Sequence, residues 1–330
     1  MPEAVSRTTT VVALWRAMES TRTTPTRLFE DPLAPAFLGG RFRWAYSLSR
    51  LPVVRAGVSW ALMDGHWSGA RGTVVVRTRY IDDLLGEALQ RGVTQVVIFG
   101  AGFDCRAYRI PGIEQTRVFE VDHPLTQGHK QAVLQRRLGA LPPHVAMCAI
   151  DFNTHTLDTV LPRAGYRREA QSFFICEGVT HYLSAGAVDT LFRYVARHAA
   201  IGSQMVFTYI HRAALGGTVT FAGAEQTLAA VRRAGEPYTF GFDPAELPQY
   251  LVARDLRLLE DIGARTYRER YLRPRGRGHE PLAEFQRAAV VEVAGERPGL
   301  AVSFRQASLI CQTLSVQSLS IAYLSPSACA

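Results

Sequence analysis

Hydrophobic and polar residues follow two different periods along this chain. Over residues 8–20 and 76–91, apolar residues recur at spacings of three and four, which predicts amphipathic helices. From about residue 95 onward, short apolar runs alternate with further helical segments. The predicted strands lie at 96–99, 117–121, 145–150, 172–176 and 204–209, and the helices among them at 124–138 and 185–200.

This alternation predicts an α/β fold, because strands that alternate with helices form βαβ units with parallel strands. We expect a doubly wound, mostly parallel, Rossmann-like sheet with an N-terminal helical cap. The predicted cap covers residues 1–75 and forms part of a substrate pocket. The main domain covers 76–295, with a lid-like insertion at 211–250, and the tail at 296–330 has no predicted structure.

Composition and charge argue against a membrane protein and against a nucleic-acid-binding protein. Of the 330 residues, 47% are hydrophobic and 20% charged, which is typical of a globular protein. The sequence has no apolar run of about 18 residues, and its first residues lack the pattern of a signal peptide. We therefore expect a cytoplasmic protein with no membrane association. The net charge is +8, but the arginines are spread along the chain, so we expect no nucleic-acid partner.

The cysteines do not predict a metal site or a disulfide framework. An odd, dispersed set without CxxC spacing favours free thiols. No pattern of His, Asp or Glu predicts a metal either, so none is expected. The five cysteines are Cys105, Cys148, Cys176, Cys311 and Cys329.

The most informative stretch is VVIFGAGFDCRAYRI at 96–110, followed by FEVDHP. Gly100 and Gly102 permit a tight turn and close backbone approach to a ligand, and Asp122 can accept both hydroxyls of a ribose. A full dinucleotide fingerprint has a third glycine where this chain has Cys105. The incomplete fingerprint favours S-adenosylmethionine (SAM) over NAD, because SAM has no pyrophosphate. The alternative is an ordinary tight turn with an acid at a strand end.

Two more acids end predicted strands. Asp151 follows the third strand and Glu177 the fourth. Because ligands of open α/β sheets bind outside the carboxyl ends of the strands, these acids and Asp122 should converge on one crevice. Asp151 with Phe152 could hold an adenine, and Glu177 could face the ammonium of a methionyl group. For each acid, capping of the next helix is the alternative.

Several motifs in combination resemble the leucine carboxyl methyltransferase-like family of SAM-dependent methyltransferases. They are RTRYIDD (77–83), VVIFGAGFDCRAYRI (96–110), VFEVDHP (118–124) with Lys130 downstream, and FFICEGVTHYLS (173–184). The likeness covers about residues 8–293. The bacterial branch of the family includes many uncharacterised methyltransferases and polyketide O-methyltransferases. The family usually has threonine where Cys105 stands; a nucleophilic, low-pKa cysteine is the alternative at this position.

The resemblance implies a role for each matched residue. Arg77 is similar to the residue that pairs with the SAM carboxylate, with Arg79 as the alternative. Gly100 would face the methionyl part and Asp122 the ribose. The implied cofactor-binding residues are Arg77, Gly100, Gly102, Asp122, Asp151, Phe152 and Glu177.

The resemblance also implies O-methylation of a small molecule, such as a polyketide or other secondary metabolite, by direct in-line methyl transfer. A carboxylate acceptor needs no base, whereas a phenol or alcohol would gain from one. Candidates for a base or an orienting group are His181, Tyr182, Tyr209 and His211; each could instead be a core or surface residue. A non-catalytic SAM-binding protein, a protein carboxyl methyltransferase and an NAD-dependent oxidoreductase stay open, and the oligomeric state is not predicted.

Overall fold

The structure is a computed structural model that describes residues 7–50, 69–150 and 156–295. Residues 1–293 form one compact unit and residues 294–330 a second. All elements below belong to the first unit. Asp151, Phe152 and the predicted tail lie outside the described residues.

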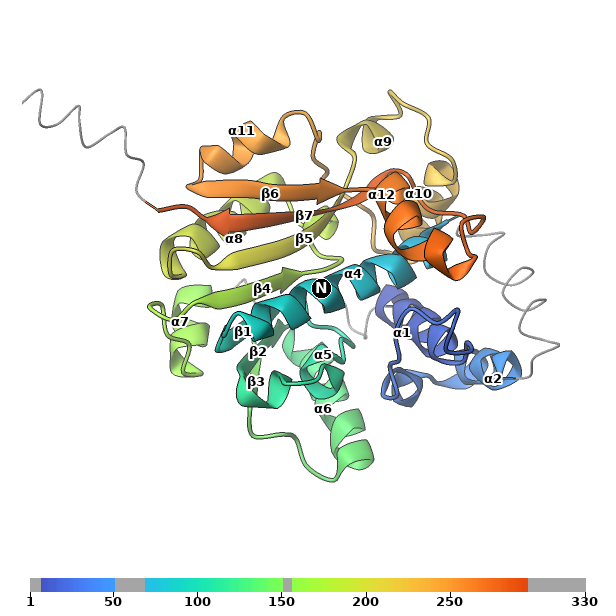
Figure 1. Cartoon of the computed structure of the whole chain (residues 1–330), viewed down its shortest axis with the longest axis horizontal. Coiled ribbons are helices and arrows are strands. Elements are labelled where there is room, and N and C mark those ends of the chain that lie inside the picture. Colours follow the sequence, from blue (N-terminus) through green and yellow to red (C-terminus); the bar gives the residue numbers. More distant parts are fainter. Residues whose placement is uncertain (1–6, 51–68, 151–155, 296–330) are drawn as a thin grey trace, which may run out of the picture. The chain divides into compact units, whose positions relative to one another are not determined.

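Seven strands form one sheet in the order β3-β2-β1-β4-β5-β7-β6 (Figure 1). Neighbours from β3 to β5 pair in parallel, and β7 runs antiparallel to β5 and β6. The predicted doubly wound, mostly parallel sheet is confirmed. The strands are β1 (Gln95–Phe99), β2 (Arg117–Asp122), β3 (Val145–Ala149), β4 (Ser172–Cys176), β5 (Gln204–Ile210), β6 (Leu256–Ile262) and β7 (Gln286–Val293).

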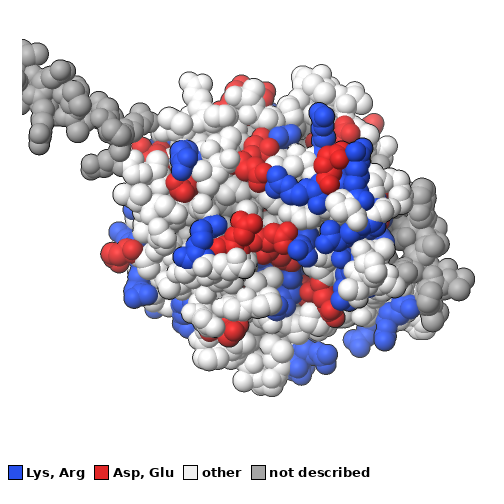
Figure 2. All heavy atoms as spheres, in the orientation of Figure 1, with Lys and Arg blue, Asp and Glu red and all other residues white. Residues whose placement is uncertain are grey.

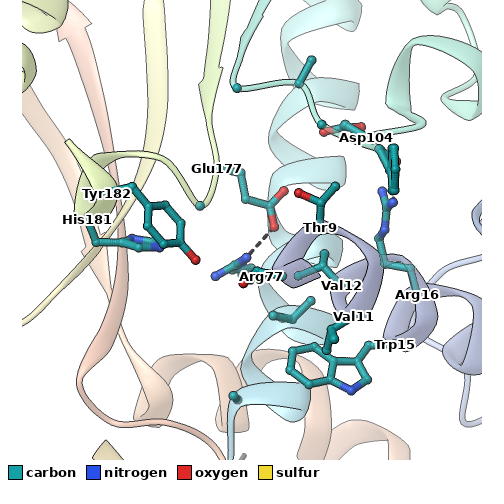
Figure 3. Close-up of a pocket in the computed structure, with 18 of the residues that line it drawn as sticks. Thr9, Val11, Val12, Trp15, Arg16, Arg77, Asp104, Glu177, His181 and Tyr182 are labelled. Atoms are coloured by element: carbon teal, nitrogen blue, oxygen red, sulfur yellow. Dashed lines mark hydrogen bonds and ion pairs between the residues drawn. The ribbon is translucent and has the colours of Figure 1, made fainter. Parts of the chain in front are cut away.

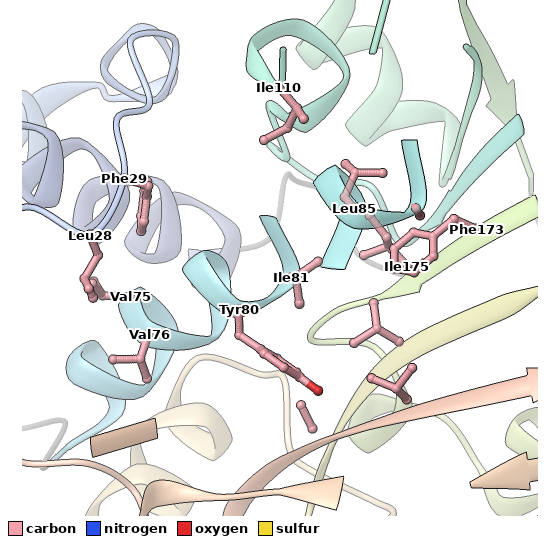
Figure 4. Packing of buried hydrophobic residues seen from close by; sticks show 14 of the residues in the cluster. Leu28, Phe29, Val75, Val76, Tyr80, Ile81, Leu85, Ile110, Phe173 and Ile175 are labelled. Carbon is pink, nitrogen blue, oxygen red and sulfur yellow. The ribbon is translucent and has the colours of Figure 1, made fainter. Parts of the chain in front are cut away.

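Helices cover both faces of the sheet. The main ones are α1 (Arg7–Ser20), α2 (Gly40–Ser49), α4 (Ala70–Gln90), α5 (Arg106–Arg109), α6 (Pro124–Leu138), α7 (Leu157–Arg163), α8 (Ala185–His198), α9 (Arg212–Gly216), α10 (Ala224–Arg233), α11 (Leu247–Val252) and α12 (Ala264–Tyr267). On one face, Ile81 of α4 packs in one cluster with Ile175 of β4 (Figure 4). On the other face, Phe174 packs among residues of α7, α8 and α11. Burial on both faces explains why the strands read as continuous apolar runs.

Helix α4 begins at Ala70, six residues before the start predicted from the periodicity. Its early residues Val74, Val75 and Val76 are β-branched and have modest helix propensity. All three are buried, so packing against the sheet and cap outweighs that propensity. The expected boundary between cap and main domain, at residues 75 and 76, lies within this helix, and the division into domains stays a prediction.

The N-terminal helices are joined to the main unit by packing and by buried charge. Leu14 and Trp15 of α1 share an apolar cluster with Val74 of α4. Near the end of α1, Glu19 pairs with the buried Arg277 at 2.7 Å, and Arg277 also pairs with Glu280. Arg277 belongs to the arginine-rich stretch RPRGRG at 273–278, which thus contains at least one residue with a structural partner.

On the face shown in Figure 2, acidic and basic side chains are interspersed. Surface ion pairs account for part of this pattern, such as Arg270 with Glu260 and Arg257 with Glu292, each at 2.6 Å. None of the described helices is both long and apolar enough to cross a bilayer.

A buried ion pair fixes α6 next to the turn after β1. Lys130, the one lysine in the sequence, pairs with Glu120 of β2 at 2.8 Å. Its Nζ atom also donates to the carbonyl of Ala101 at 3.4 Å, and Tyr108 donates to Glu120 at 3.2 Å. Burial raises the pKa of Glu120, although Lys130 opposes that effect.

Lys130→Met should lower the free energy of unfolding by about 3–5 kcal/mol, because Glu120 would be left as an unpaired buried charge. Urea unfolding measures the loss. The double variant Lys130→Met/Glu120→Gln removes both charges but keeps an acceptor for Tyr108, and it should recover most of the stability. A loss below about 1 kcal/mol in the single variant would contradict this role of the pair.

Candidate functional site

The strand order reverses between β1 and β4, and open α/β sheets bind ligands at such a reversal. The Gly-Ala-Gly turn follows β1 and Glu177 follows β4, so two predicted motifs meet there. A cavity lies at this point. Its lining residues are Thr8, Thr9, Val11, Val12, Trp15, Arg16, Ala70, Val74, Arg77, Ile98, Phe99, Gly100, Ala101, Gly102, Phe103, Asp104, Glu177, Gly178, His181, Tyr182, Thr227, Tyr238 and Gln286.

Both glycines of the turn are required by close packing and by backbone conformation. Gly100 has φ +59° and Gly102 has φ +40°, a region that disfavours other residues. A Cβ atom on Gly100 would lie 2.4 Å from Cγ2 of Val179, and one on Gly102 would lie 3.1 Å from Cγ2 of Thr9. The turn therefore presents bare backbone to the cavity.

Asp122 holds this turn against the end of β2. One carboxylate oxygen accepts from the N–H of Gly102 at 2.5 Å, and the other accepts from the N–H of His123 at 2.6 Å. Asp122 is half-buried and is not among the lining residues of the cavity. Because an ionised carboxylate has about four acceptor positions, Asp122 retains capacity for ligand hydroxyls.

Arg77 and Glu177 meet at the base of the cavity (Figure 3). Nε of Arg77 donates to Glu177 at 2.8 Å, and Nη1 lies 3.5 Å from the amide oxygen of Gln286. The alternative residue, Arg79, pairs with Asp83 at 2.8 Å, donates to the carbonyl of Leu28, and is not among the lining residues. The structure thus brings Arg77, but not Arg79, to the cavity.

Arg106 connects three of the motifs. This residue is buried and pairs with Asp82 at 2.8 Å, with Asp104 and with Glu177 at 2.7 Å. Burial opposes the ionisation of Glu177, but Arg106 and Arg77 outweigh burial and lower its pKa. Burial also opposes ionisation of Asp104, yet Arg106, with Arg16 and Lys130, lowers its pKa to about 2. Glu177 and Asp104 are therefore ionised, and their charges are compensated by arginine.

The N-terminal helix and the 211–250 segment supply the remaining walls. Figure 3 shows Thr9, Val12 and Trp15 of α1 on one side of Arg77, with His181 and Tyr182 on the other. Thr227 of α10 and Tyr238 also line the cavity. The sequence predicted that both segments would shape a pocket, but it did not identify these residues, whose types and spacing carry no distinctive chemistry.

The structure separates the acceptor-side candidates into two pairs. His181 and Tyr182, in a 3₁₀ turn (Thr180–Tyr182), line the cavity. Tyr209 is not among the lining residues; its hydroxyl donates to Asp261 at 2.8 Å. His211 is also outside the lining, and its Nδ1 atom accepts from the N–H of Ala213 at the start of α9. Only the first pair is placed to meet a ligand.

Cys105 is fully buried, and burial raises the pKa of its thiol well above the usual value. A buried, protonated thiol is a poor nucleophile, so the low-pKa alternative is not favoured. The three described cysteines are free. Within residues 7–50, 69–150 and 156–295, no group of three His, Cys, Asp or Glu residues could hold a metal ion.

Asp104→Asn should cost about 3 kcal/mol of stability at pH 7, because the native carboxylate has a pKa of about 2 against about 3.9 when unfolded. An acid whose pKa is lowered by folding stabilises the fold at pH values above its unfolded-state pKa. That stability is lost as the pH falls through its folded-state pKa. The difference between parent and variant should therefore shrink to about half by pH 3 in urea unfolding. An equal difference at pH 7 and pH 3 would contradict the ion pair. The exposed Asp158→Asn is the control and should change stability by less than about 1 kcal/mol.

Comparisons with known proteins identify the family. The leucine carboxyl methyltransferase family model matches residues 9–196. A relative from Frankia alni, named "putative S-adenosyl-L-methionine-dependent methyltransferase", is 35% identical over 209 residues, which are 63% of this chain and 69% of the relative. A Streptomyces coelicolor relative with the same description is 36% identical over 207 residues, covering 63% and 70%.

A solved structure supports the fold. The structure of a "putative methyltransferase" from Thermobifida fusca has a TM-score of 0.51 and 16% identity, and the match covers 84% of this chain and 97% of that one. The resemblance found in the sequence is confirmed by the family model, which spans more than half of the chain. The chain belongs to the leucine carboxyl methyltransferase family of SAM-dependent methyltransferases.

Proposed function

We propose that the protein binds SAM at the end of β1 and β4 and transfers its methyl group to an oxygen of a small molecule. The observation that carries this proposal is the meeting of Arg77, the bare Gly100–Gly102 turn and Asp122 at the reversal of the strand order. Arg77 and the turn offer a cation and close backbone approach in one cavity. Asp122, which is not a lining residue, is bonded to the turn through the N–H of Gly102 and offers a hydroxyl acceptor next to it.

The carboxylate, the ammonium and the ribose of SAM would each have a partner among the described residues. The guanidinium of Arg77 would hold the carboxylate, since its Nη atoms are not taken by the Glu177 pair. Glu177 and the backbone of Gly100 would face the ammonium, and Asp122 would accept the ribose hydroxyls. Asp151 and Phe152 are proposed beside the adenine from their sequence match alone.

The chemistry of the transfer leaves the protein mainly a positioning task. When bound, SAM would supply a methyl group on a positively charged sulfur. The acceptor oxygen would bond to the methyl carbon in line as the carbon–sulfur bond breaks to leave neutral sulfur, and a hydroxyl acceptor would release its proton to water. The protein must hold the acceptor close to that carbon and at the correct angle. The walls from α1, α10 and the 3₁₀ turn surround the space where the acceptor would sit.

A walled cavity favours a small acceptor, because a protein acceptor would have to insert a flexible segment. Val11, Val12, Trp15 and Tyr182 give the cavity apolar and aromatic lining. This composition suits an organic metabolite, and we propose a polyketide or another secondary metabolite. Reaction in the cytoplasm is part of the same proposal.

The cofactor proposal is tested by isothermal titration of the purified protein with S-adenosylhomocysteine (SAH), with NAD and NADP as parallel titrants. We expect micromolar binding of SAH and no binding of either dinucleotide, because the turn lacks the third glycine that serves a pyrophosphate. Dinucleotide binding without SAH binding, in a protein shown to be folded, would overturn the proposal.

Two variants test the residues that would hold SAM. Asp122→Ala should weaken SAH binding by about 10- to 100-fold, since the ribose hydroxyls lose their acceptor and the turn loses its tether. Arg77→Ala should weaken it by at least about 10-fold through loss of a charge-assisted contact. Arg79→Ala removes a nearby arginine of the same helix and should leave the Kd within about twofold. Unchanged SAH affinity in both site variants would contradict the assignment.

A further inference from the structure

One wall of the cavity carries buried polar groups that the cofactor proposal does not use. Nδ1 of His181 is buried and lacks a hydrogen-bond partner among the described residues, and so does Oγ1 of Thr227. Both residues are at least nine-tenths buried, and both line the cavity. A buried polar group without a partner costs about 1–3 kcal/mol, so a ligand that bonds to these atoms would relieve that cost.

Aromatic rings enclose His181. Its ring centroid lies 4.4 Å from that of Tyr238 and 4.5 Å from that of Tyr182, and the two tyrosine rings lie 5.3 Å apart. The carbonyl of His181 accepts from the N–H of Thr239 at 2.8 Å, which ties the tyrosine-bearing loop to the 3₁₀ turn. We call His181, Tyr182, Thr227 and Tyr238 the neutral wall.

The neutral wall carries no charge at physiological pH. Burial, together with the nearby Arg77, lowers the pKa of His181 to about 3, so the imidazole stays neutral. Burial raises the pKa of Tyr182 and of Tyr238, so both hydroxyls stay protonated. Thr227 has a hydroxyl that does not ionise. These groups can exchange hydrogen bonds with a ligand but cannot compensate an anion.

The cations that line the cavity are already paired. Arg77 pairs with Glu177 and faces the site proposed for the SAM carboxylate. Arg16 lies 3.4 Å from Asp31 and donates to the carbonyl of Phe103. Among the described lining residues, no cation is left over for a second carboxylate. Burial of an uncompensated carboxylate is expensive, so such an acceptor would bind poorly.

We propose that the neutral wall selects an acceptor that carries an uncharged hydroxyl on an aromatic ring and discriminates against a carboxylate. His181 accepts the hydrogen bond of the acceptor hydroxyl and orients its oxygen, and Thr227 supplies a second polar contact. Trp15, Tyr182 and Tyr238 pack against the ring. This inference rests on the proposed function, because it assigns the substrate class of the same cavity.

Binding of matched aromatic probes to the protein saturated with SAH tests this selection. Isothermal titration compares 2-naphthol with 2-naphthoate, which share the ring system and differ in the polar group. We expect 2-naphthol to bind at least about 10-fold more tightly than 2-naphthoate. Its Kd should be constant from pH 6 to pH 8, because His181 does not titrate in that range. Equal or tighter binding of 2-naphthoate, or no binding of 2-naphthol, would overturn the inference.

Variants connect the selection to His181. His181→Phe keeps an aromatic ring but removes the acceptor, and it should weaken 2-naphthol binding by about 3- to 10-fold while the Kd of SAH stays within twofold. His181→Gln retains an amide oxygen and should restore much of the loss. His198→Gln, at the end of α8, is the control and should change neither affinity. Thr227→Val, a nearly isosteric change, should weaken 2-naphthol by about 2- to 5-fold if His181→Phe does not fold.

The outcomes separate the two proposals. Loss of SAH binding in the parent protein would defeat the proposed function itself. If SAH binds normally, and if His181→Phe and Thr227→Val both keep the parent's preference for 2-naphthol over 2-naphthoate, only the proposed role of the neutral wall would be contradicted.

Discussion

The site depends on the buried chain of charges from Arg77 through Glu177 to Arg106. Arg106 is almost without solvent contact, and its partners come from α4, from the turn after β1 and from the end of β4. An unpaired charge in this buried set would cost free energy of folding, because the interior has a low dielectric constant. The fold must therefore bring all the partners into contact. The network therefore sets the relative positions of the three segments that form the proposed cofactor side of the cavity, and the Nη atoms of Arg77 are not used in its pair with Glu177.

The cavity combines two electrostatic environments. On the cofactor side, ionised groups compensate one another, and Arg77 has donors to offer an anion. On the other side, the four residues of the neutral wall carry no charge. SAM carries a carboxylate, an ammonium and a sulfonium, so it suits the first environment. An uncharged acceptor suits the second. The division offers the two proposed substrates distinct places in the cavity.

Much of this arrangement could be predicted from the sequence, because buried parallel strands and Gly-rich turns leave strong patterns. The strand runs, the sheet class and the meeting of Gly100 with Glu177 follow from them. The start of α4 at Ala70 could not be predicted, because the packing of three valines outweighs their modest helix propensity. Tyr209 and His211 were predicted at the site because they lie at the end of a strand, but position along the chain does not show which side chains reach the cavity. Tyr209 packs with Phe207 in the cluster on the α8 face, whereas the hydroxyl of Thr208 accepts from Gly178 beside the cavity. Arg106 and Thr227 needed the structure, because Arg106 pairs with the distant Asp82 and Glu177, and Thr227 reaches the cavity from a helix whose sequence carries no distinctive chemistry.

The most direct test of the central claim is a crystal structure of the protein with SAH. The account predicts the homocysteine carboxylate within hydrogen-bond distance of Arg77 and the ribose hydroxyls on the carboxylate of Asp122, with Arg77 still paired to Glu177. The space beside His181 should stay open to the acceptor. SAH bound at another edge of the sheet, or with its carboxylate turned away from Arg77, would contradict the account.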